Sequence, residues 1–455
     1  MCIAARDQGK IDCGLEPLFS ASATTQQDRQ EKGMHITMAA TTSYCFLVMA
    51  ISAALVLYSY IKICRQERSW INWYTFPVFL TLASGYLLPS IYLLVFHPDG
   101  SYFANAYCYM TYACSSLSMM FGYRMAHAAA GSTRDPKLYR YSYKLFPWIL
   151  LASSVLLYLP VLIEFRDLLL TPREIYMQTR TGYGINFFGS AVMMFLAFVT
   201  YLFKKRKSYA GGCLLCGICA TLIFLHGTKG EVLGLIEIFI LYRVYILRRR
   251  VSVASAVASI AAMAIVGTLW FALLGGLTDF GELAVSMSAY SDYTRNAMLV
   301  IDDPKGQLYW GRLTMEDEVY SRIPRIIMPN KPKDFGGFKL ASIYYPEWFQ
   351  GDAGSPSFGM GEQYADFGVF AIVFISLWSA LSGWVVALLI ASLKQRPEPG
   401  RFLVLLFFSG VGIIPVGDGY LLPETIMLGA MLTFVYRHRF VVLNQTSTPE
   451  VLPSS

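Results

Sequence analysis

Apolar segments of about 20 residues recur from one end of this chain to the other, which is the length that a helix needs to cross the core of a bilayer. Hydrophobic residues make up 55% of the 455 residues and charged residues only 15%. Backbone groups inside a bilayer have no water to pair with, so each crossing segment must be helical. The sequence therefore predicts an all-α polytopic membrane protein with about 11 transmembrane helices, at 38–61, 73–96, 103–123, 145–163, 184–203, 210–226, 232–247, 253–274, 367–393, 402–416 and 420–436.

Basic residues gather in every second loop between these segments, and short basic loops mark the cytoplasmic side of a membrane protein. The loops carry Lys62, Arg65 and Arg68; Arg134, Lys137, Arg140 and Lys144; Lys204 to Lys207; Arg248 to Arg250; Lys394, Arg396 and Arg401; and Arg437 and Arg439. This pattern predicts that the N-terminus and the 275–366 loop lie outside and that the C-terminus lies in the cytoplasm. The net charge of +7 follows from the same pattern and does not indicate a nucleic-acid partner.

The chain divides into five predicted regions. Residues 1–37 form a polar extension that we expect to be disordered, with Met34 and Met38 as alternative start positions. Residues 38–274 form a first membrane helix bundle, 275–366 a large periplasmic loop, 367–440 the C-terminal membrane helices, and 441–455 a disordered cytoplasmic tail.

The large loop between Gly275 and Asp366 is rich in aromatic residues and mixed in charge. It contains a basic run punctuated by prolines, which comprises Arg322, Arg325, Lys331 and Lys333. The segment Met315–Ile323 is predicted to be a short helix that Pro324 ends. The guanidinium group of arginine binds phosphate through two hydrogen bonds without a metal ion, so this basic run suits a lipid-linked diphosphate. It can also stabilise the negative charge that develops on the diphosphate as it leaves. A nearby carboxylate or His could take the proton of an attacking hydroxyl.

Two further external segments carry ionisable residues. The segment 164–183 contains Arg173 and Arg180. The segment from His226 through Lys229 to Glu231 forms a tight link between two predicted spans, where charged groups must face a cavity or one another. A structural pair of Lys229 with Glu231 is the alternative to a functional site there.

Neither candidate metal motif is persuasive. Cys213, Cys216 and Cys219 are spaced like metal ligands, but they lie within an apolar span, where Cys behaves as a small apolar residue. Asp302 and Asp303 resemble an acidic metal pair, yet no third ligand follows at a suitable spacing. We therefore expect neither a metal nor a cofactor.

Three stretches together resemble one known family. They are Thr228-Lys229-Gly230-Glu231, the loop segment from Ile323-Pro324-Arg325 to Pro329-Asn330-Lys331-Pro332, and the closing segment Gly361-Glu362-Gln363-Tyr364-Ala365-Asp366-Phe367-Gly368. With the architecture of residues 40–440, they resemble the Wzy-type oligosaccharide repeat unit polymerases of O-antigen and capsule. The resemblance implies a C-type membrane glycosyltransferase that inverts configuration without a metal ion. It would transfer a growing glycan from undecaprenyl diphosphate onto the next lipid-linked repeat unit at the periplasmic face.

The resemblance and the chemistry together select the candidate site residues. The catalytic candidates are Arg325, Arg322, Glu318, Glu362 and His226, and the substrate-binding candidates are Arg173, Arg180, Lys229, Arg295, Lys331 and Tyr364. The family also contains an Arg and a Gly separated by ten residues, and this spacing recurs here at Arg173 with Gly184, Arg325 with Gly336 and Arg295 with Gly306. We further expect Arg173, Lys229 and Arg325 to converge on one cavity. The expected partners are undecaprenyl-diphosphate-linked oligosaccharides, membrane lipids and a chain-length regulator protein.

Two other functions remain open. An O-antigen ligase resembles this architecture but uses a His in the large external loop, and no His occurs between Gly275 and Asp366. A lipid flippase or transporter would carry charges within several spans and broken helices at the midplane, whereas most of the predicted spans here are free of charge.

Overall fold

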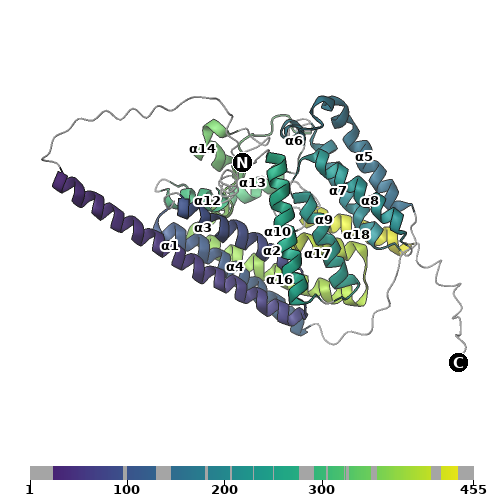
Figure 1. Cartoon of the computed structure of the whole chain (residues 1–455), viewed down its shortest axis with the longest axis horizontal. Coiled ribbons are helices and arrows are strands. Elements are labelled where there is room, and N and C mark those ends of the chain that lie inside the picture. Colours follow the sequence, from purple (N-terminus) through teal and green to yellow (C-terminus); the bar gives the residue numbers. More distant parts are fainter. Residues whose placement is uncertain are drawn as a thin grey trace, which may run out of the picture. The chain divides into compact units, whose positions relative to one another are not determined.

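The computed structural model describes residues 24–95, 100–129, 145–179, 183–204, 207–228, 230–249, 251–275, 292–303, 306–321, 323, 327–349, 356–410 and 422–438. Regular structure in these residues is helical, with no β-strand among them (Figure 1). The predicted all-α class is therefore confirmed for the part of the chain that is described.

A helix lies in each apolar segment predicted to cross the membrane. These are α1 (Thr24–Glu67), α2 with η1 and α3 (Thr75–Val95), α4 (Tyr102–Ala129), α5 (Phe146–Glu164), α7 (Gly184–Leu202), α8 (Tyr209–His226), α9 (Gly230–Leu241) with η3 (Tyr242–Ile246), α10 (Val253–Gly275), α16 (Ala371–Gln395), α17 (Pro399–Phe408) and α18 (Leu422–His438). Among the described residues, 5 helical stretches are long and apolar enough to cross a membrane: Thr42–Glu67, Phe146–Glu164, Gly184–Leu202, Tyr209–His226 and Met360–Gln395. The count of eleven spans stays a prediction.

The N-terminal boundary differs from the expected one. Helix α1 already begins at Thr24, whereas the sequence predicts that the first apolar segment begins at 38. Its long uninterrupted ribbon is plain in Figure 1. Residues 1–23 and 439–455, which include the predicted C-terminal tail, lie outside the described residues.

The chain forms two compact units. The first comprises residues 1–58, 80–117 and 279–376, and the second comprises 59–79, 118–278 and 377–455. The described residues from 292 to 366, which belong to the predicted external loop, therefore fold in the first unit. The helices α5, α7 and α8 fold in the second.

Helix α7 is the most enclosed of the five long apolar stretches, since 67% of its apolar window is buried, against 28% for each of the others. It packs along α5, and the hydroxyl of Ser154 on α5 donates to the carbonyl of Ser190 on α7 at 2.8 Å. The second unit is thus built around α7.

Glycines bring α4 and α16 into close contact within the second unit. A methyl group added to Gly122 would lie 1.9 Å from the carbonyl oxygen of Ala380, and one added to Gly383 would lie 2.1 Å from that of Met119. Small residues at helix crossings allow backbones to approach closely in membrane proteins. Both glycines are therefore required by the packing rather than by backbone conformation.

The described part of the external loop has a small core of its own in the first unit. Four short helices surround this core: α12 (Asp292–Asp302), α13 (Arg312–Tyr320), α14 (Gly337–Tyr344) and α15 (Met360–Phe367). Their buried contacts come from Val300, Leu313, Leu340, Ala341, Phe358 and Ala365. The helix predicted at Met315–Ile323 is present as α13, but it begins and ends three residues earlier.

Candidate functional site

The carboxylate of Asp366 holds the end of the external loop to the start of α13. It accepts hydrogen bonds from the backbone N–H of Leu313 at 3.0 Å, from that of Thr314 at 2.9 Å, and from the Thr314 hydroxyl at 2.6 Å. The first N–H groups of a helix have no partner within it, and negative charge is favoured beside them. The N–H of Trp310 also donates to the Asp366 carbonyl at 2.9 Å. Asp366 is fully buried, so this carboxylate fixes the loop rather than reaching a substrate.

The paired glycines that begin α14 lie against three carboxylates. The N–H of Gly336 donates to Glu316 at 3.2 Å, and the N–H of Gly337 donates to Asp317 at 3.4 Å. A methyl group on Gly336 would lie 2.1 Å from an oxygen of Asp317, and one on Gly337 would lie 2.5 Å from an oxygen of Glu362. The catalytic candidate Glu362 is thus half-buried at the N-terminus of α14.

The described cations of the loop lie against specific neighbours. Arg295 forms an ion pair with Asp292 at 3.2 Å. The ammonium of Lys331 lies 4.6 Å from the ring centre of Phe335, a cation–π contact. Lys331 is only 8% exposed. Both cations are therefore held in place, and Lys331 is largely covered.

The remaining described candidates of the first unit are Tyr364 and Glu318. The ring of Tyr364 meets that of Tyr107 edge-on at 5.1 Å. Glu318 is half-buried on α13. Both side chains belong to the helices α13 and α15, which pack on each other.

The acidic pair Asp302 and Asp303 serves hydrogen bonding within the first unit. Asp302 accepts from the backbone N–H of Ser101 at 2.6 Å and from its hydroxyl at 2.5 Å. Asp303 accepts from the Tyr344 hydroxyl at 2.8 Å. Burial and this bond raise the pKa of Tyr344, which keeps the phenol protonated as the donor. The pair therefore fastens the ends of α12 to its neighbours.

His226 occupies a buried polar site at the C-terminal end of α8, in the second unit. Its Nδ1 lies 2.8 Å from a carboxylate oxygen of Glu231, and its Nε2 lies 3.2 Å from the Ser190 hydroxyl. The rings of Tyr158 and Phe187 enclose the imidazole at 4.6 Å and 5.0 Å. His226 is fully buried. It therefore cannot contact a substrate in this conformation. Its imidazole instead holds the carboxylate of Glu231 in place.

Gly227 brings the end of α8 against the short helix α6 (Pro172–Thr179), which carries Arg173. Gly227 has a φ of +62°, and a methyl group on it would lie 2.4 Å from the carbonyl oxygen of Pro172. Arg173 is half-buried, and its guanidinium lies 4.6 Å from the ring centre of Tyr176. The structure thus brings two of the sequence candidates, Arg173 and His226, to the same end of the second unit.

Four candidate residues lie outside the described part of the chain: Arg180, Lys229, Arg322 and Arg325. The expected convergence of Arg173, Lys229 and Arg325 therefore stays a prediction. The alternative pairing of Lys229 with Glu231 also stays open, although Glu231 already has His226 as a partner.

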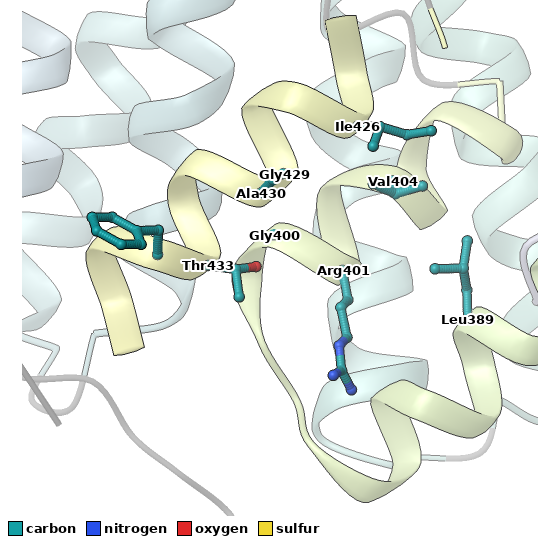
Figure 2. Close-up of a pocket in the computed structure, with 9 residues that line it drawn as sticks. Leu389, Gly400, Arg401, Val404, Ile426, Gly429, Ala430 and Thr433 are labelled. Carbon is teal, nitrogen blue, oxygen red and sulfur yellow. The ribbon is translucent and has the colours of Figure 1, made fainter. Parts of the chain in front are cut away.

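One apolar cavity is lined by none of the described candidate residues. It has a volume of 510 Å³ and lies between α17, α18 and the end of α16 (Figure 2). Its one charged side chain, Arg401, forms an ion pair with Glu398 at 3.2 Å and donates to Ser392. Gly400 and Gly429 bring the two helices together there. With one cation that already pairs with a carboxylate, this lining lacks the cluster of cations expected for a diphosphate.

The second cavity, of 460 Å³, runs along α5 and α8 and is lined by Leu162, Cys213, Gly217 and Leu225 among others. Cys213 and Cys216 are exposed and Cys219 is buried, all on the single helix α8. The three thiols therefore do not face one common point.

Sequence reasoning missed the roles of several residues. Ser190 and Tyr158 are polar residues within apolar spans, and this is the one signal that could have marked them as partners of His226. Asp366 belonged to a motif that the sequence singled out, but its bond to residues 53 positions earlier could not be read from any local pattern.

Comparison with known proteins agrees with this architecture. The chain is 35% identical over 405 residues to the O-antigen polymerase of Salmonella typhimurium, which covers 87% of this chain and 98% of that protein. The O-antigen polymerase of Salmonella typhi matches with the same identity and coverage. No family model and no solved structure matches the chain. Similarity of this extent over nearly the whole relative confirms the resemblance seen in the sequence motifs, and the chain belongs to the O-antigen polymerase family.

Proposed function

We propose that this chain joins oligosaccharide repeat units into an O-antigen polysaccharide. The main support for this proposal is that the chain is 35% identical to O-antigen polymerases across 98% of their length. The repeat units would be carried on undecaprenyl diphosphate and joined at the periplasmic face of the inner membrane. A chain-length regulator protein is the further partner that we expect.

The reaction is a glycosyl transfer that needs neither a metal ion nor a cofactor. A hydroxyl of the lipid-linked acceptor attacks the anomeric carbon of the donor glycan, and the bond from that carbon to the diphosphate oxygen breaks. The electron pair of that bond leaves with the diphosphate, and the hydroxyl proton passes to a protein base. A single displacement of this kind inverts the configuration of the anomeric carbon.

Cations would stabilise the charge that grows on the leaving diphosphate. We assign this role to Arg322 and Arg325 in the predicted external loop, and Lys331, which is only 8% exposed, would add its positive charge to the site without direct contact with the diphosphate. Arg173, Arg180 and Lys229 would hold the diphosphate of the acceptor, and Arg295 and Tyr364 would contact the glycan. Because two charged lipids must be held in one fixed geometry, much of the rate would come from positioning.

The geometry favours Glu362 as the proton acceptor over the other two candidates. His226 is fully buried, with both ring nitrogens beside polar partners. Glu318 is half-buried on α13, whereas the carboxylate of Glu362 lies directly against the backbone of Gly337. Glu362 stands at the N-terminus of α14, where the helix favours the ionised carboxylate that a base requires.

Loss of Arg325 tests the proposed function directly. Cells in which this gene is deleted would be complemented with the wild-type chain, Arg325→Ala, Arg325→Lys or the control Lys333→Ala, since Lys333 is exposed in the same basic run. We expect the wild type and the control to give a full ladder of polysaccharide lengths and Arg325→Ala to give single repeat units. Arg325→Lys should restore only part of the ladder, because an ammonium cannot make a two-point contact with phosphate. A full ladder from Arg325→Ala would show that this residue has no such role.

A purified system tests the chemistry. The protein would be mixed with lipid-linked repeat units in the presence of a metal chelator, and the new linkage would be read by NMR. We expect polymer to form, with the anomeric configuration opposite to that of the donor. Glu362→Gln should reduce the rate by about a hundredfold, the scale of a lost general base, whereas Glu318→Gln should leave it nearly unchanged. Retained configuration or dependence on a metal ion would refute the proposed mechanism.

A further inference from the structure

Exposed apolar side chains form one stripe on the outer face of α13 and continue to Trp310, two residues before the helix. Trp310 is 79% exposed and Met315 is 63% exposed, and Val319 is exposed as well. Residues four apart lie on the same face of a helix, so Met315 and Val319 are neighbours. Leu313, on the opposite face, is buried in the core of the loop.

The backbone at Trp310 has a conformation that bulky residues rarely adopt. Its φ is +54°, and the φ of the following Gly311 is +83°. The N–H of Trp310 is fixed by its hydrogen bond to the Asp366 carbonyl at 2.9 Å. A large apolar ring held exposed by a strained backbone points to a contact outside the chain.

This stripe is continuous with a helix able to cross the membrane. A methyl group placed on Gly311 would lie 3.3 Å from the ring of Phe367, and that ring packs on Phe374 of α16 at 5.0 Å. Phe374 and Phe370 are themselves exposed. They belong to the stretch Met360–Gln395, which is long and apolar enough to span a bilayer. Lipid that covers the exposed rings of α16 would therefore extend onto α13.

The charges beside the stripe fit the same partner. Arg312 lies at the start of the exposed face of α13, and its guanidinium pairs with Glu316 at 2.6 Å. The hydrogen bond to Glu316 raises the pKa of Arg312, which stays charged. A cation beside an apolar stripe can reach lipid phosphate while its stem lies on apolar surface, and Trp is the residue that favours the headgroup level.

We propose that Trp310, Met315 and Val319 form an interfacial face that lies in the headgroup and upper acyl region of the bilayer, with phospholipid as its partner. This face would set the depth of α13, and hence of the loop residues bound to it, relative to the membrane. The proposal does not depend on the proposed polymerase reaction, because contact with lipid is measured without any substrate.

Photo-crosslinking of the full chain tests this contact. A diazirine-bearing phenylalanine would replace Met315, Val319 or the exposed control Asp334, in nanodiscs of phosphatidylethanolamine and phosphatidylglycerol. We expect about tenfold more phospholipid adduct at positions 315 and 319 than at 334, as for a helix lying in the interface. Equal adduct at all three positions, or adduct only at 334, would overturn the proposal.

Substitution of Trp310 provides a second test of the proposed lipid contact. Trp310→Gly removes the ring but suits the positive φ, so folding should be retained, and Trp310→Phe keeps an apolar ring. With the probe at 315, lipid adduct should fall severalfold in Trp310→Gly and stay near the wild-type amount in Trp310→Phe. An unchanged yield in Trp310→Gly would show that Trp310 does not hold the face in the membrane.

Discussion

His226 and Glu231 lie 2.8 Å apart in a site enclosed by aromatic rings, and neither side chain is more than 5% exposed. A buried polar group that loses its partner is destabilising by about 1–3 kcal/mol. We therefore expect Glu231→Ala to lower the thermal unfolding temperature of the purified protein in detergent. Glu174→Ala serves as the control, because Glu174 is exposed at the same end of the second unit. If the two variants unfold at the same temperature, the pair does not contribute to stability.

A second prediction concerns the close contact between α4 and α16. Gly122→Ala should destabilise the protein by about 1–3 kcal/mol, as overpacking does, because the added methyl would overlap the Ala380 carbonyl. Gly217→Ala is a matched control in the interior of another helix, since a methyl there would meet nothing within 4 Å. The control should be neutral or stabilising by up to about 1 kcal/mol, from helix propensity. Thermal unfolding of both variants in one detergent provides the comparison, and equal effects would contradict the proposed contact.

The third prediction compares two of the three glycines that follow an arginine with ten residues between them. Gly336 has a φ of +54° and lies against Asp317, whereas a methyl on Gly184 would meet only Phe188, at 3.9 Å. Gly336→Ala should therefore disrupt the loop and increase its cleavage by added protease in spheroplasts. Gly184→Ala should behave like the wild type. Similar cleavage of both variants would mean that the loop tolerates a side chain at 336.

The fourth prediction tests the membrane topology. Glu347 is exposed in the loop. In cells whose outer membrane alone has been permeabilised, the cysteine of Glu347→Cys should react with a maleimide that cannot cross the inner membrane. A Cys placed at Tyr209, which is 90% exposed beside a basic loop, should react only after the inner membrane is opened. The reverse order of labelling would invert the orientation derived from the basic loops.

The membrane helices could be predicted from sequence because their signal is local. Apolar runs of about 20 residues can satisfy their backbones in lipid in one way only, and helices such as α5 and α7 lie where the sequence places them. The short helix α13 could be predicted to within three residues at each end. Its true start is set by Asp366, which is distant in sequence.

The site was less predictable, because it depends on contacts between remote segments. The ionisable groups from His226 to Glu231 were expected to face a cavity or one another, and Glu231 bonds to His226, since the turn at Gly227 folds the chain back there. The pairing of Lys229 with Glu231 stays a prediction. Lys331 was expected to bind substrate, but only 8% of it is exposed and its ammonium lies over the ring of Phe335. Charge and spacing identify which groups can act, whereas burial decides which of them a substrate can reach.

The bonds from Asp366 to Leu313 and Thr314 close the intervening chain into a ring at its base. A segment that is fixed at both ends can change in length between them without shifting the helix that follows. Length changes within this segment that spare its packed core and the residues Met315 and Val319 would therefore leave the start of α16 in place. The position of a membrane helix is in this way made independent of the length of the chain that precedes it.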